Sequence, residues 1–109
     1  MFVLDADPQF THTVKVKVPD NGGYRDESFQ ATFRVIPAEE AATFDLTSGA
    51  ASADFLRRAI VHMDGLVTTD REPVSYNDAV RDQVLGLPYA RAALGRTYFE
   101  AIQGARAGN

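Results

Sequence analysis

Cysteine is absent from the 109-residue chain, and histidine occurs only twice. Without cysteine there can be no disulfide, no thiolate zinc site and no cysteine nucleophile. No apolar run approaches the roughly 20 residues that a membrane helix needs. The opening segment Met1–Asp5 lacks a basic region, so we expect no signal peptide. We therefore expect a soluble protein, consistent with the cytosol.

Charge of one sign is also not concentrated anywhere in the chain. The net charge is -4, with acidic and basic residues interspersed, and no basic stripe is available to neutralise phosphates. We expect no nucleic-acid binding. Hydrophobic residues make up 45% and charged residues 24%, as in ordinary globular proteins. The length predicts a single domain over residues 1–109.

The clearest local pattern is a β-hairpin near the start of the chain. Apolar and polar residues alternate over 10–18 and again over 29–35, which is the period of a half-buried strand. Turn-forming residues fill 19–23 between them. The residues predicted to form the buried face are Val14, Val16, Phe29 and Phe33.

Helical patterns follow the hairpin. The spacing of apolar residues, with Pro37, Ser75 and Pro88 as start signals, predicts helices. The predicted ranges are 38–46, 52–63, 76–85 and 88–103, with a short strand at 66–67 and a small tail at 105–109 after Gly104. The fold class is thus α+β: an N-terminal β-hairpin, or small antiparallel sheet, packed against three or four C-terminal helices.

The two histidines do not indicate catalysis. His12 lies on the apolar face of a predicted strand, where a core or rim histidine is the ordinary interpretation. His62 and Asp64 could form a base with its orienting carboxylate, but a predicted helix would point them apart and no nucleophile is evident. His62 is predicted to be neither catalytic nor a metal ligand.

Other chemical motifs are also missing. The acidic pairs at 5–7 and 70–72 lack the spaced ligands of a calcium loop. The glycines at 22–23 lack the lysine of a phosphate loop. We therefore expect a binding protein with no catalytic residue, no metal and no cofactor.

Much of the chain resembles the tail assembly chaperones of long-tailed bacteriophages. The helix-then-glycine stretch Phe55–Leu66, the turn Glu72–Asn77 and the stretch Leu87–Leu94 are similar to successive elements of that family. Tyr98–Ala101 continues the likeness into a small-residue tail, and the hairpin around Phe29–Phe33 is compatible with it.

The resemblance implies a non-catalytic protein from a phage or prophage that acts in the cytoplasm of the bacterial host. Such chaperones bind the long helical tape measure protein, keep it soluble during tail assembly and are absent from the finished virion. Tail tube subunits and further copies of the chain are additional candidate partners. The alternative functions are a structural tail or head–tail connector component of the virion, and a small enzyme using His62 with Asp64.

The last predicted helix supplies the candidate partner surface. Residues 90, 94, 98, 101 and 102 form one apolar side of this helix, and residues 92, 95 and 99 lie beyond it. The apolar arc is therefore wider than the stripe that contact with a single core requires. One interpretation is burial on two sides. The other has Leu94 and Ile102 facing the hairpin and Phe99 facing a partner helix, which Phe99→Ser would test. The candidate contacts are Tyr89, Tyr98, Phe99 and Ile102.

Overall fold

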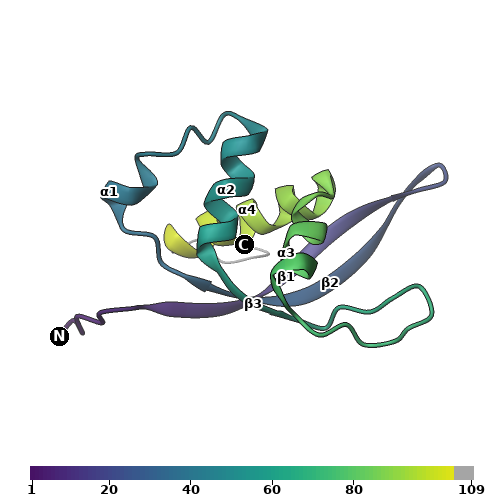
Figure 1. Cartoon of the computed structure of the whole chain (residues 1–109), viewed down its shortest axis with the longest axis horizontal. Helices are drawn as coiled ribbons and strands as arrows, with labels where there is room; N and C mark the ends of the chain where they lie inside the picture. The colour runs from purple at the N-terminus through teal and green to yellow at the C-terminus, as the bar shows by residue number, and fades with distance from the viewer. Residues whose placement is uncertain (105–109) are drawn as a thin grey trace.

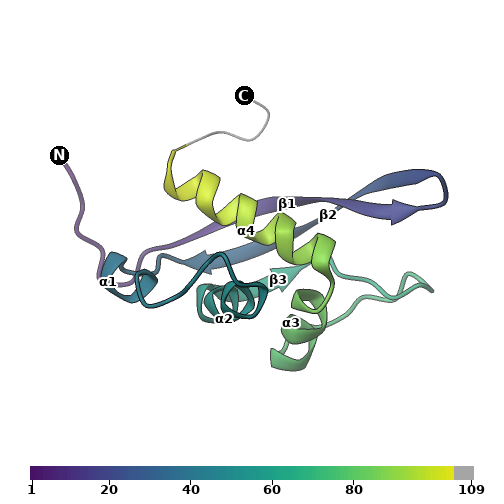
Figure 2. The same ribbon diagram turned by 90° about the horizontal axis from the view of Figure 1, so that it is seen from above.

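A computed structural model describes residues 1–104 and confirms the α+β fold (Figure 1). Within this range a three-stranded antiparallel sheet, in the order β1-β2-β3, carries its helices on one face (Figures 1 and 2). The elements are β1 (Gln9–Asp20), β2 (Gly23–Arg34), α1 (Ala38–Ala41), α2 (Gly49–Ala59), β3 (Ile60–Asp64), α3 (Asp78–Leu85) and α4 (Pro88–Ile102). The predicted tail at 105–109 lies outside the described residues.

The predicted hairpin is confirmed. β1 and β2 pair from Gln9 opposite Arg34 to Asp20 opposite Gly23. Gly22 in the tight turn has a φ of 74°, a conformation that glycine adopts without steric cost. The predicted buried residues all point into the core, with exposed fractions of 9% or less: Val14, Val16, Phe29 and Phe33.

The predicted helix over 52–63 is wrong at both ends. α2 already begins at Gly49, where the Ser48 side chain accepts a hydrogen bond from the Ala51 N–H at 3.4 Å. It ends at Ala59, and the chain continues as strand β3 against β2.

A β-bulge explains why β3 looks helical in sequence. Ile60 pairs with Phe33 and Met63 pairs with Ala31, and the register shifts between them. The extra residue of a bulge turns positions three apart to the same side of a sheet. Ile60 and Met63 are therefore both buried, and their spacing imitates one face of a helix.

Other predicted boundaries also move. α1 ends at Ala41 rather than at Leu46. α3 begins at Asp78, because Asn77 and not Ser75 caps it by accepting a hydrogen bond from the Val80 N–H at 2.8 Å. The predicted strand at 66–67 is reduced to one isolated bridge between Val67 and Pro73.

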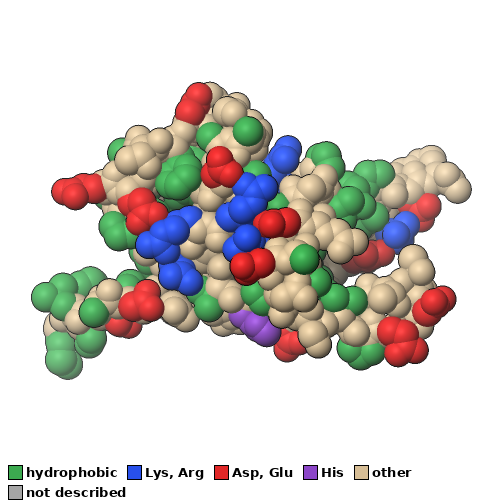
Figure 3. All heavy atoms as spheres, viewed as in Figure 1, with side chains coloured by type: hydrophobic (Ala, Val, Ile, Leu, Met, Phe, Trp, Pro, Cys, Tyr) green, Lys and Arg blue, Asp and Glu red, His purple; other side chains and the backbone are tan. Residues whose placement is uncertain are grey.

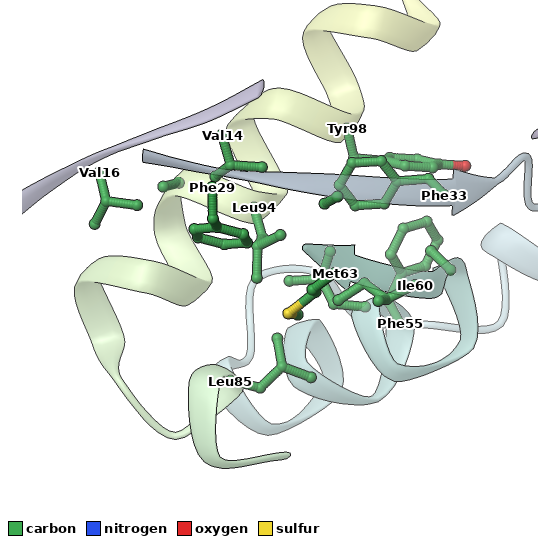
Figure 4. Packing of buried hydrophobic residues seen from close by; sticks show 14 of the residues in the cluster. Val14, Val16, Phe29, Phe33, Phe55, Ile60, Met63, Leu85, Leu94 and Tyr98 are labelled. Carbon is green, nitrogen blue, oxygen red and sulfur yellow. The ribbon is translucent and has the colours of Figure 1, made fainter. Parts of the chain in front are cut away.

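The last helix matches its prediction closely. α4 begins at Pro88 and ends at Ile102, and Gly104 follows with a φ of 76°. α4 lies across β1 and β2, while α2 and α3 lie toward β3 (Figure 2). Side chains from these elements meet in one core (Figure 4).

Candidate partner-binding groove

An apolar groove of about 190 Å³ opens between α2 and α4. Phe55 and Leu56 come from α2, and Phe99 comes from α4. On the α4 side the groove is also lined by two small residues, Ala92 and Gly95, which leave space between the helices. The remaining lining residues are Leu46, Ser52, Pro88 and Arg91. A cavity of about 150 Å³ with apolar walls accepts a benzene-sized group, so this groove can accept one large apolar side chain.

Tyr98, one of the candidate contacts, belongs to the core instead. It is only 3% exposed, and its hydroxyl oxygen accepts a hydrogen bond from the Ile36 N–H at 3.0 Å. Its ring packs edge-on against Phe33 and Phe55 (Figure 4). A side chain held on all sides in this way presents no surface to a partner.

Phe99 is partly buried and forms a wall of the groove. Its ring stacks on Phe55 with 5.4 Å between the ring centroids and meets Tyr98 edge-on at 5.1 Å. The expected outward orientation is therefore only partial. Phe99 both packs against the core and lines the groove.

The remaining two candidates lie away from the groove lining. Leu94 faces the sheet as expected, but Ile102 is 45% exposed, so its predicted position against the hairpin is wrong. Eight residues of α-helix turn the chain through two turns plus about 80°, which carries Ile102 off the side that Leu94 occupies. Tyr89 is partly buried against the core.

Sequence reasoning missed the part of the groove that comes from outside α4. The apolar arc of the last predicted helix did include residues 92, 95 and 99, but the helical pattern gave no indication of Leu46, which lies between α1 and α2. It also missed that Gly95 leaves open space. A β-carbon added at Gly95 would have no neighbour within 4 Å.

Electrostatically, the groove contains one cation without a counter-ion in residues 1–104. Arg91 lines the groove and forms no ion pair within that range. By contrast, Arg57 pairs with Asp54 and Asp82, and Arg58 pairs with Glu40. Arg91 is thus available to an anionic group entering the groove.

His62 lies on strand β3, not on a helix, so the helical argument for separating it from Asp64 does not hold. Both residues pair with β2 on the sheet face that the helices leave open. No hydrogen bond or ion pair joins them within residues 1–104: the Asp64 carboxylate accepts from the Gly65 N–H at 3.0 Å. The His62 ring instead meets Tyr76 at 5.3 Å, and burial raises the pKa of the Tyr76 hydroxyl.

His12 occupies the rim of the sheet. Its side chain is exposed, and its ring packs edge-on against Phe10 at 5.4 Å. Across residues 1–104, no three histidine, aspartate or glutamate side chains lie together as a metal site would need. No helix in that range is long and apolar enough to cross a membrane.

Comparisons with protein-family models, curated proteins and solved structures give no match.

Proposed function

We propose that the chain is a phage or prophage tail assembly chaperone that binds the tape measure protein in the cytoplasm of the bacterial host and performs no catalysis. The apolar groove between α2 and α4 is the observation on which the proposal rests. An amphipathic helix binds its receptor by placing apolar anchor residues in such a groove. The tape measure protein, a long helical chain in this family, offers repeated anchors of this kind.

The segments that resemble tail assembly chaperones include residues that form this groove. The stretches Phe55–Leu66 and Leu87–Leu94 contribute residues to both walls of the groove. Tyr98 lies within another of the similar stretches, where its buried hydroxyl fixes the orientation of α4 against the segment after β2. The similar segments thus build and position one surface.

Gly95 gives a way to close the groove without disturbing the core. A side chain at this position projects into space that no other atom occupies within 4 Å of the added β-carbon. Gly95→Leu therefore fills the groove, and Gly95→Ala is the matched control because it adds the same β-carbon and leaves most of the volume free. Both variants gain helix propensity over glycine by up to about 1 kcal/mol, so neither should lower the melting temperature.

The test is co-expression of each variant with a tape measure protein from the same phage or prophage. We expect wild type and Gly95→Ala to keep that protein in the soluble fraction and to co-purify with it, and Gly95→Leu to fail at both. Equal solubilisation by the two variants would show that the groove is not the binding site.

Mass spectrometry of purified virions separates a chaperone from a structural component. A chaperone should be absent from the particle. Recovery of the chain in stoichiometric amounts would overturn the proposal in favour of a tail or head–tail connector protein.

A further inference from the structure

The segment Met1–Leu4 carries an uninterrupted run of exposed apolar side chains. Phe2 is 85% exposed and Leu4 is 89% exposed. The segment projects beyond the end of the sheet, and its apolar side chains gather there at the surface (Figures 1 and 3). Scattered exposed apolar residues are normal, but a contiguous group of large ones marks an interaction surface.

The chain just after this segment is attached to the sheet at Pro8. The Pro8 carbonyl accepts a hydrogen bond from the Val35 N–H at 3.0 Å. The Asp7 N–H donates to the Asp5 carboxylate at 3.0 Å. Beyond Pro8, the apolar arm, defined as residues 1–4, continues past the end of the sheet (Figure 1).

The groove between α2 and α4 complements the arm in polarity and charge. It is lined mainly by apolar side chains and contains Arg91, which has no ion-pair partner in residues 1–104. The arm presents apolar side chains followed at once by Asp5 and Asp7. An arm lying along the groove would bury one of its large apolar side chains there and bring one of these carboxylates toward the unpaired guanidinium.

Pairing of β1 edges is a poorer route to self-association. α4 lies across β1, and the Arg96 guanidinium donates to the Lys15 carbonyl at 3.2 Å. Pro19 removes one N–H from the same strand. Covered carbonyls and proline are both features that disfavour edge-to-edge pairing.

We infer that the chain self-associates by arm exchange, in which one large apolar side chain from the arm of one copy, Phe2 or Leu4, enters the groove of another copy, with Asp5 or Asp7 facing Arg91. Residues 1–7 together span at most about 25 Å when extended, so the arm can enter a neighbouring molecule without unfolding β1. Reciprocal exchange closes a dimer, and sequential exchange builds a ring. The inference requires only the chain itself and goes beyond the proposed function. The two share the groove, so a copy's arm and a partner helix compete for it.

Engineered cysteines test this directly, since the chain has none of its own. One chain carries Leu4→Cys, and a second chain with a different mass tag carries Ala92→Cys on the exposed side of the groove. We expect mild oxidation of the mixture to give a disulfide between the two chains. Leu4→Cys mixed with Gln83→Cys, an exposed position on α3 outside the groove, is the matched control and should give at least ~10-fold less.

Cross-linking no greater than in the control would overturn the inference. A chain with both Leu4→Cys and Ala92→Cys that closes within a single molecule would also overturn it, because the arm would then serve its own groove.

Sedimentation gives an independent readout. Phe2→Ser with Leu4→Ser should weaken self-association on the order of 100-fold, because neither position then offers a large apolar side chain to bury in the groove. Both positions are exposed, so the melting temperature should not change. Arg91→Glu should also weaken association, and Asp5→Arg with Asp7→Arg should restore it.

A wild-type chain that remains monomeric at every concentration would contradict arm exchange. The arm variants should still solubilise the tape measure protein, so failure of this inference is distinguishable from failure of the proposed function.

Discussion

The two sides of α4 are both apolar, yet one is closed and the other is open. Leu94 and Tyr98 pack against the sheet and are almost fully buried. Ala92, Gly95 and Phe99 border the groove. The difference lies in side-chain size and in what the opposite element supplies. An apolar arc on a helix therefore identifies surface that must be covered, without saying whether the domain itself or a second molecule covers it.

The largest effect is expected on the closed side, at the hairpin residue that packs against Tyr98. Phe33 is fully buried, so Phe33→Ala should lower the free energy of unfolding by about 3–5 kcal/mol in chemical denaturation. Thr32→Ala is the matched control. The Thr32 hydroxyl only contacts Thr11 on the open sheet face, at 2.8 Å, so its loss should cost about 0.2–1 kcal/mol. Equal costs would show that the sheet faces are assigned incorrectly.

Tyr98→Phe tests the polar contact of the closed side. The change leaves the buried Ile36 N–H without its acceptor, so we expect a loss of about 1–3 kcal/mol in the free energy of unfolding. Tyr89→Phe, on the same helix, should have little effect. Comparable stability of the two variants would mean that the Tyr98 hydroxyl does not orient α4.

Phe99 lies between the two sides and should affect both properties. Phe99→Ser removes the stack on Phe55 and should lower stability by about 1–2 kcal/mol, less than for full burial. It should also abolish co-purification with the tape measure protein. Phe99→Leu keeps an apolar wall and should retain most of the binding. A melting temperature that collapses with Phe99→Ser would assign the residue wholly to the core.

The smallest effect is expected away from the groove, between α2 and α3. The hydrogen bond from Arg81 lowers the pKa of the Asp82 carboxyl, and a hydrogen bond from Arg57 adds to the shift. The resulting stabilisation is present above the ordinary aspartate pKa and is lost as pH falls through the lowered value. Asp82→Asn should therefore slightly lower the melting temperature at pH 7. The difference should vanish at pH 2, and a difference independent of pH would contradict this origin.

The sequence was sufficient where local geometry decides the structure. Alternation in 10–18 and 29–35 predicted the buried face of the hairpin, and Pro88 and Gly104 predicted the limits of α4. It failed at 60–64, because the bulge opposite Thr32 and Phe33 places Ile60 and Met63 on one side, as a helix would. Pairing with strand β2, which is distant in sequence, determined the conformation of residues 60–64, and local propensity does not predict such pairing.

The candidate site was predictable only in part. Phe99 was identified because it lies beyond the side of the predicted helix that a single contact with the core would cover. Tyr98 shares the side of Leu94 in the helical pattern, but its hydrogen bond could not be predicted, because the Ile36 N–H that donates to its hydroxyl lies 62 residues away. Leu46 enters the groove through the path of an irregular segment, which periodicity does not describe.

The most direct test of the groove as the binding site is cross-saturation NMR of the labelled chain with a tape measure protein fragment. Signals should weaken at Ala92, Gly95 and Phe99 on α4 and at Leu56 on α2, and should remain unchanged on the open sheet face at Thr11, Thr32 and His62. Weakening confined to the sheet face, with none in the groove, would contradict the account.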